Sequence, residues 1–394
     1  MTPFEAVTLA DPYVYYAGLR QQNGLLFDTS LRLWIASSAN AVEAVLRHPD
    51  CRVRPLNEPV PAAIAQSAAG RVFGRLMRMN EGARHLCPRM AIEPALAAVD
   101  RQGLAGIVAR VVESLDDPGD NFDELMFTLP VCVIASLVGV PVCQLREVAK
   151  LTRDFVACLS PLSDDVQLGK ANDAATRLSQ VFSELLNNEA EGSHLLSALR
   201  NSGETRAWED PDALIANLIG LLSQTCEATA GLIGNSLVAL QRQPDLQGTL
   251  RATPLVAARL VAEVARFDPS VQNTRRFVAK RCTVEGRVLE AGDSVLVLLA
   301  SANRDPGANP DPDSFLLNRP GRRTFGFGSG RHECPGRQLA MAIAAEAILA
   351  WLHRQPTSSA RLYQWQYRPS LNGRIPQFEP GRRTPTLTAA IDEA

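Results

Sequence analysis

The sequence has little of what marks several common classes of protein. Lys and Arg total 40 against 42 Asp and Glu, so the formal net charge is −2 and no global basic field indicates nucleic-acid binding. None of the 8 cysteines lies in a CxxC pair, which argues against a closely spaced zinc site. No run of about 18 residues is free of polar groups. We therefore expect neither nucleic acid nor a membrane as a partner.

The chain also lacks internal divisions. No Gly/Ser-rich or Pro-rich linker interrupts its 394 residues and no period repeats, so we expect a single domain over residues 1–394. Its 46% hydrophobic content is enough for a large core. The N-terminus has neither the basic start nor the apolar run of a signal peptide, and the cysteines sit among apolar neighbours as reduced thiols do. Both features favour a reducing cytoplasm.

The most informative stretch is Phe327–Gly336, which reads FGSGRHECPG. Its glycines let the backbone turn sharply and approach a flat object closely. Pro335 is suited to the first position of a helix, so the apolar run that follows predicts a helix with Cys334 at its N-terminus. Unpaired N–H groups and the helix dipole favour a thiolate at such a place. A shielded thiolate presented to a planar partner is what haem iron requires from an axial cysteine.

Two simpler interpretations of Cys334 stand beside this one. A lone cysteine is most often a buried core residue, and a structural zinc site needs about four ligands. The pattern F-G-x-G-x-x-x-C-x-G is, however, too long to be a chance match. With it the chain resembles the cytochrome P450 family of haem-thiolate monooxygenases, in its soluble bacterial form.

The resemblance implies a fold and a cofactor. The fold would be mainly α with small β-sheets, and haem b would lie between a long central helix and the helix that follows the cysteine loop. Cys334 would bind the iron. Within the loop, Phe327, Gly328, His332 and Gly336 would contact the haem.

Two further segments resemble the family's clamp on the haem propionates. His85 and Arg89 are four residues apart and share a face if the segment is helical, although Pro88 is unusual inside such a helix. An ordinary solvated basic face is the alternative for this pair. Arg276, at the start of a predicted strand, matches the second propionate ligand.

Residues from Asp210 to about Arg242 predict one long helix, which begins at Asp210-Pro211 and is ended by Pro244. At 1.5 Å per residue it spans on the order of 48 Å. Its first half is apolar nearly all round, so the helix should cross the core. The polar insertion at 223–229 is out of place there unless it has a function. In the family this part of the helix forms the oxygen-binding groove beside the haem.

The groove departs from the family pattern A-G-x-[DE]-T-[ST]. Gln224 and Thr225 replace the first Ala and Gly, Glu227 keeps the acid, and Ala228 replaces the threonine whose hydroxyl relays protons. Thr225 lies about one turn before Ala228 and is a candidate substitute, while Thr229 is expected to bond the helix backbone. A hydroxyl of the substrate, or a register slip that makes Thr229 the relay residue, are the alternatives.

An E-x-x-R pair, Glu263 and Arg266, lies on an otherwise apolar helix. Buried charges of this kind should pair with each other and with a third group, because an unpaired buried charge is costly. The resemblance supplies Arg319 as that group and makes all three residues structural. A solvated helix face is the commoner setting for E-x-x-R alone.

The rest of the chain supplies pocket walls and strands. Strands are expected at 25–27, 33–35, 284–288 and 294–299, and apolar helices at 122–140 and 144–159. The resemblance makes residues 158–188 a helix pair that covers the substrate pocket, and 367–376 a hairpin whose tip touches substrate. It places Gln224, Val271 and Asn273 against the substrate.

The function implied is insertion of one oxygen atom of dioxygen into a small or medium organic substrate, in secondary metabolism. A G-x-G-x-x-G segment after a strand is missing, so electrons should come from an external ferredoxin and ferredoxin reductase, with the enzyme a monomer. We expect a basic patch that steers the ferredoxin, formed by Arg84, Arg322, Arg323, Arg331 and Arg337.

Other outcomes of the same chemistry stay open at this point. Because of Ala228, desaturation, oxidative coupling and peroxide-driven oxidation are alternatives. A haem sensor or carrier without turnover is a hypothesis from a different class, and retention of Glu227 argues against it.

Overall fold

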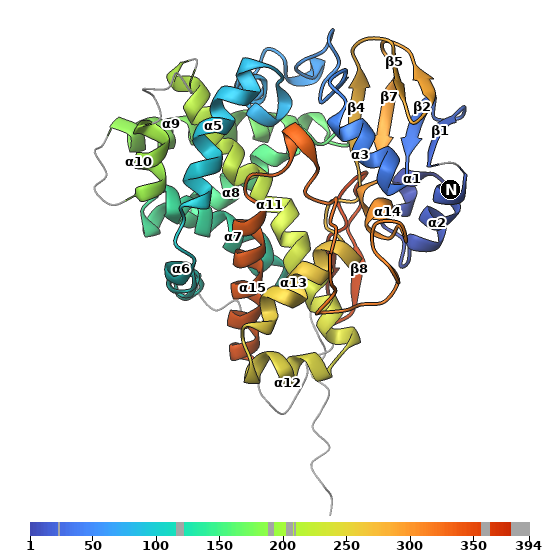
Figure 1. The fold of residues 1–394 in the computed structure, drawn as a ribbon. Coiled ribbons are helices and arrows are strands. Elements are labelled where there is room, and N and C mark those ends of the chain that lie inside the picture. Colours follow the sequence, from blue (N-terminus) through green and yellow to red (C-terminus); the bar gives the residue numbers. More distant parts are fainter. Residues whose placement is uncertain are drawn as a thin grey trace, which may run out of the picture.

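The computed structural model describes residues 1–22, 24–115, 122–187, 193–201, 208, 210–355 and 363–379. Helices form most of this part of the chain, and a five-stranded sheet lies at one side, next to the N-terminus (Figure 1). The prediction of a mainly α fold with small β-sheets is therefore confirmed. No helix within the described ranges is both long enough and apolar enough to cross a bilayer.

The α-helices are α1 (Pro3–Ala6), α2 (Tyr13–Gln21), α3 (Ala39–Arg47), α4 (Ala68–Arg75), α5 (Ala83–Ala97), α6 (Arg101–Ser114), α7 (Phe122–Val138), α8 (Leu145–Val156), α9 (Asp165–Asn187), α10 (His194–Asn201), α11 (Pro211–Arg242), α12 (Asp245–Ala252), α13 (Val256–Phe267), α14 (Leu299–Asn303) and α15 (Arg337–Arg354). Short 3-10 helices include η1 (Ala62–Ile64), η2 (Met77–Met79), η3 (Val142–Gln144), η4 (Ala157–Leu159) and η6 (Gly330–His332). The strands are β1 (Leu25–Asp28), β2 (Leu33–Ala36), β3 (Cys51–Arg52), β4 (Thr274–Val278), β5 (Cys282–Val284), β6 (Arg287–Leu289), β7 (Ser294–Val297), β8 (Trp365–Tyr367) and β9 (Pro376–Phe378).

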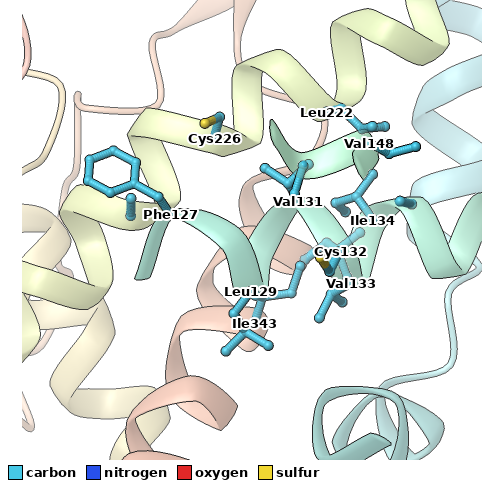
Figure 2. Packing of buried hydrophobic residues seen from close by; sticks show 14 of the residues in the cluster. Phe127, Leu129, Val131, Cys132, Val133, Ile134, Val148, Leu222, Cys226 and Ile343 are labelled. Atoms are coloured by element: carbon cyan, nitrogen blue, oxygen red, sulfur yellow. The ribbon is translucent and has the colours of Figure 1, made fainter. Parts of the chain in front are cut away.

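The long central helix is confirmed as α11, which has 32 residues. Its start is fixed by Asp210, whose side chain accepts a hydrogen bond of 2.7 Å from the N–H of Ala213, and by Pro211 at the first position. Apolar side chains of α7 and α8 pack against it around Leu222 and Cys226 (Figure 2). α7 is itself buried on nearly all sides, so α11 is held in the interior of the helical part.

The main sheet has the order β1-β2-β7-β4-β3, with β2 and β7 parallel and the other pairs antiparallel. Strands at 25–28, 33–36 and 294–297 agree with prediction, but the strand expected at 284–288 is wrong. The chain reverses there, with Glu285 and Gly286 at φ 46° and 71°, and forms the β5–β6 hairpin. Two successive positive φ values are typical of a tight hairpin turn, which the apolar pattern alone did not indicate.

The region expected to be a lid of two helices also differs. α8 ends at Val156 and continues as η4, and a single helix, α9, then occupies residues 165–187. α9 packs on α8 and α4 through an apolar face that includes Leu178 and Phe182. The last residue of the predicted pair, Asn188, lies outside the described residues.

The predicted cluster around Glu263 is present, with one more member. Arg266 and Arg319 place their Nε atoms 3.0 and 3.2 Å from Glu263 Oε1, and Arg322 places its Nε 2.8 Å from Oε2. Glu263 and Arg266 are fully buried. Burial acts to raise the pKa of Glu263, but the guanidinium groups and the N–H of Leu316 outweigh it, so the pKa is lowered. This cluster ties α13 to the segment that leads into the cysteine loop.

We expect Glu263→Gln to lower the free energy of unfolding by about 3–5 kcal/mol, because the change leaves buried guanidinium groups without their counter-charge. The exposed pair between Arg281 and Glu290, 3.2 Å apart, is the matched control. Glu290→Gln should cost about 1 kcal/mol or less. Denaturant unfolding of both variants measures the difference, and equal losses would contradict a structural role for the cluster.

Candidate haem-binding site

The cysteine loop is built by the backbone. The N–H of Cys334 donates to the carbonyl of Phe327 over 2.8 Å, and the N–H of Glu333 closes the η6 turn onto Gly330. Gly330 has φ 70°, and a Cβ there would stand 3.0 Å from Arg47, so the position requires glycine. The helix starts later than predicted: Gly336 is the N-cap and α15 begins at Arg337, so Pro335 precedes the helix.

The electrostatics of Cys334 also differ from expectation. Burial raises the pKa of the Cys334 thiol, while the backbone N–H of Gly336 and the charges of Arg89 and Arg337 offset this only in part. The helix N-terminus therefore does not produce a thiolate alone, because desolvation of the charged sulfur is the larger effect. A bound cation such as iron supplies the missing counter-charge, since metal binding deprotonates a coordinating thiol.

α5 brings two of the predicted residues to the cysteine loop. The helix includes Pro88, as the prediction required, and its His85 ring lies 4.0 Å from the ring of His332. The Nε2 of His85 is 2.8 Å from the carbonyl oxygen of Arg331. Arg89 donates through Nη1 to the carbonyl of Glu333 over 2.6 Å. Both side chains thus contact the loop next to Cys334, rather than forming a solvated basic face.

Buried donors without partners surround the same loop. Arg276 on β4 is 5% accessible, and its Nε has no hydrogen-bond partner. Burial lowers the pKa of Arg276 to about 10. His332 approaches Glu81 to 3.2 Å, yet neither of its ring nitrogens completes a hydrogen bond. Buried polar groups are normally satisfied, so these donors indicate an anionic ligand.

The residues present fit a haem. Carboxylates such as the two propionates would satisfy Arg276 and His332 on the same side of the loop. Gly336 borders the sulfur, since a Cβ there would lie in ordinary contact with it, 4.0 Å from Cys334 Sγ and 3.7 Å from Leu96, and glycine leaves that position empty. A flat ligand can therefore approach the sulfur where a side chain would stand.

The groove residues of α11 are arranged differently from the expectation. Thr225 donates its hydroxyl to the carbonyl of Leu221 over 2.7 Å, and Gln224 donates to Gly220 over 2.9 Å. Thr229 is 2% accessible, and no hydrogen bond joins its hydroxyl to any residue in the described ranges. A hydroxyl has one proton to donate, so Thr225 is engaged and Thr229 is available. The backbone bond expected for Thr229 is thus made by Thr225, while the residue that relays protons stays a prediction.

An internal space between α11 and the cysteine loop is inferred from the accessibility of three side chains. Glu227, Cys334 and Arg78 all keep accessible surface, yet protein surrounds each of them closely enough for desolvation to dominate its pKa. Burial raises the pKa of Glu227, and the charges of Arg368 and Arg78 offset this only in part. A surface pocket of about 530 Å³ between η1, α4 and α9 contains none of these residues.

The two residues expected to face substrate from the segment after α13 both contact the last hairpin. Asn273 is 3% accessible and donates to the carbonyl of Leu371 over 2.8 Å. Val271 pairs with Gly373 in an isolated bridge. The amide of Asn273 is therefore occupied by the hairpin tip, and Asn273 is better described as positioning the tip.

The predicted basic patch is largely neutralised. Arg322 belongs to the Glu263 cluster, Arg323 pairs with Glu43 at 2.6 Å, and Arg331 pairs with Glu81 at 3.1 Å. The two remaining arginines, Arg337 and Arg84, also have interaction partners. A strong unpaired positive surface made by these five residues is thus not present.

Sequence reasoning missed one cluster near the loop. The ligand atoms of His48, Cys51 and Cys282 all lie within 4.8 Å of one another. Arg331 fixes this region by donating to the carbonyls of His48 and Cys51. Two thiols and one imidazole are three donors, one fewer than the four of a closed structural zinc site. Because Cys282 is far from the other two in sequence, no spacing pattern could have revealed it.

The site and its likeness to known proteins define the class of protein, which is an oxidoreductase of the haem-thiolate type. The chain belongs to the cytochrome P450 family. The family model described as Cytochrome P450 matches residues 218–359. The cytochrome P450 monooxygenase PikC of Streptomyces venezuelae is 30% identical over 362 residues, which cover 88% of this chain and 84% of that protein. The vitamin D(3) 25-hydroxylase of Pseudonocardia autotrophica is 34% identical over 74% of this chain and 68% of that protein.

Solved structures confirm the fold. P450BioI, in complex with an acyl carrier protein ligated to hexadec-9Z-enoic acid, superposes with a TM-score of 0.82 at 24% identity, covering 96% of this chain and 98% of that one. CalO2 superposes with a TM-score of 0.82 at 23% identity, covering 97% and 99%. At these identities the likeness concerns the fold alone.

Replacing Cys334 tests the ligand assignment. We expect Cys334→Ala to abolish the red-shifted Soret band of the reduced carbon-monoxide complex, which requires an axial thiolate. Cys226→Ala, which removes a buried thiol from α11, is the control and should keep the band. Survival of the band in Cys334→Ala would contradict the assignment.

Glu81 should make stability depend on pH in acid. Burial acts to raise its pKa, but His332 and Arg331 outweigh it and lower the pKa to about 2, from an ordinary value of 4.5. A lowered folded-state pKa contributes stability above pH 4.5, and this contribution is lost as pH falls toward 2. We expect Glu81→Gln to flatten the fall in unfolding free energy across this window, by at most about 3 kcal/mol. An unchanged slope in acid denaturation curves would count against the contact.

Proposed function

We propose that the protein inserts one oxygen atom from dioxygen into an organic substrate, using haem b and electrons from a ferredoxin system. The observation that carries the proposal is the half-buried Cys334, which lies at the end of a glycine-shaped loop with unsatisfied buried donors around it. The names of PikC, a monooxygenase, and of the vitamin D(3) 25-hydroxylase support this type of reaction. We also propose a single-domain, monomeric, cytoplasmic enzyme.

Each residue near the loop has a proposed task. Cys334 holds the iron, which when bound supplies the redox chemistry that activates dioxygen. His85, Arg89, Arg276 and His332 bind and orient the two propionates through charge-assisted hydrogen bonds.

Small or flat groups would border a bound haem. Phe327, Gly328 and Gly336 lie in the loop on the cysteine side, and Ala228 lies on α11 on the opposite side. Small side chains permit close approach of the backbone, which excludes water from the reacting centre. Gln224, although it bonds to Gly220, is the α11 residue that we propose borders the substrate.

Protons need a route past Ala228. We propose that Glu227, whose pKa is raised by burial, takes up protons and passes them toward the space beside α11. The hydroxyl of Thr229 donates to no residue in the described part of the chain and is free to act, whereas the hydroxyl of Thr225 is held by Leu221. The threonine next in sequence to Ala228 thus replaces the missing relay hydroxyl.

Because the arginines of the predicted basic patch are paired, we propose that electron delivery does not depend on that patch. We propose that the ferredoxin docks on the cysteine side by shape and local contacts, with weak dependence of the reduction rate on ionic strength. Because Ala228 stands where the family has its relay threonine, peroxide-driven oxidation is the second candidate reaction.

Variants of the two threonines test the proton route. We expect Thr229→Ala to lower product formed per electron consumed and to raise hydrogen peroxide release by about tenfold to a hundredfold. Thr225→Ala is the matched control and should change coupling little, because its hydroxyl serves the helix backbone. Glu227→Gln should slow the proton-dependent steps, more so in heavy water.

The measurement is coupling efficiency with a turned-over substrate and a surrogate ferredoxin system. A large loss of coupling in Thr225→Ala with none in Thr229→Ala would instead support Thr225 as the relay residue. Full activity with hydrogen peroxide and none with the ferredoxin system would favour the second candidate reaction.

A further inference from the structure

Arg78 is a buried cation that none of the proposed steps uses. It lies in η2, between α4 and α5, and its Nε is buried without a hydrogen-bond partner. No ion pair or hydrogen bond joins its side chain to any residue in the described ranges. An unpaired charge away from water is costly, so such a group persists where a ligand completes it.

The surroundings of Arg78 locate it in the internal space. η2 is held against α11, because the N–H of Met77 donates to Asn217 Oδ1 over 2.9 Å. Cys158 in η4, Cys334 in the cysteine loop and Glu227 on α11 are ionisable groups near Arg78. Arg78 therefore lies beside α11, in the internal space.

Neither neighbour neutralises it. Burial raises the pKa of the Cys158 thiol to about 12, so this group carries no charge at neutral pH. Glu227 forms no ion pair with Arg78 in the structure, and its own pKa is raised. The positive charge of Arg78 thus meets no anion of the described chain.

Other residues already account for binding of the haem propionates. His85 and Arg89 reach the cysteine loop from α5, and Arg276 and His332 present unsatisfied donors beside it. No hydrogen bond within the described ranges joins the Arg78 side chain to any of these four residues. A second anion is needed to satisfy it, and the substrate is the group that enters there.

We propose that Arg78 binds a carboxylate of the substrate, so that the natural substrate is an organic monoanion. The planar guanidinium matches a carboxylate with two parallel hydrogen bonds. A phosphate dianion fits less well, because Arg78 carries a single positive charge and the second negative charge would stay buried without a partner. This inference rests on the proposed haem-thiolate function and specifies its substrate class.

The test uses probes that the iron itself anchors. A series of ω-(imidazol-1-yl)alkanoic acids of graded chain length, their methyl esters and the matching phosphonic acids is titrated into the haem-loaded protein. The imidazole shifts the Soret band on binding, whatever the other end carries. The comparison is made for wild type, Arg78→Met, Arg78→Lys and the surface control Arg110→Met, whose side chain is exposed on α6.

At the best chain length, the acid should bind wild type about tenfold to a hundredfold more tightly than its ester, as expected for a hydrogen bond to a charged group. Arg78→Met should abolish this preference, Arg78→Lys should restore part of it, and Arg110→Met should keep it. Arg78→Gln, also neutral, replaces Arg78→Met if the latter fails to fold.

Three results would overturn the assignment: equal binding of acid and ester to wild type at every length, survival of the preference in Arg78→Met, or tighter binding of the phosphonic acid. Loss of haem from Arg78→Met and Arg78→Gln alone would assign Arg78 to the cofactor and also overturn it. If no imidazole probe shifts the wild-type spectrum, the haem-thiolate function itself fails, which is a separate outcome.

Discussion

The site is governed by one constraint: a sulfur that must carry negative charge lies where burial opposes that charge. Burial raises the pKa of Cys334, and the helix N-terminus does not compensate because α15 begins only at Arg337. The loop therefore has to hold the sulfur rigidly for a metal to bind it. The hydrogen bond from Cys334 to Phe327 does this locally, and the Glu263 cluster fixes the chain that enters the loop.

The same electrostatic argument connects the cofactor and the substrate. Burial leaves Arg276, His332 and Arg78 with donors that the protein does not satisfy. Two of these groups adjoin the cysteine loop, where haem carboxylates would lie, and the third, Arg78, lies in η2 beside α11. Each of these three donors thus indicates a place where an anion would bind. Together the three donors divide the internal space into a part for the cofactor and a part for the substrate.

The sequence was sufficient wherever function depends on a contiguous pattern. The cysteine loop, α11 and the pair Glu263–Arg266 were predicted because glycine spacing, capping and helical periodicity are local properties. Contacts between distant segments were not predictable in this way. The hydroxyl of Thr225 is taken by Leu221 within its own helix, but the pairing of Arg322 with Glu263 depends on tertiary packing. The isolation of Arg78 is likewise a property of the folded chain, since sequence cannot show that a cation has no partner.

X-ray absorption at the iron edge of the haem-loaded protein tests the central claim most directly. The structure predicts one sulfur scatterer at bonding distance from iron, in addition to the haem nitrogens, because Cys334 is the cysteine that the loop presents. In Cys334→Ser the sulfur contribution should vanish, while the nitrogen shell stays. A spectrum of the unaltered protein without a sulfur ligand, or one whose sulfur survives in Cys334→Ser, would contradict the account.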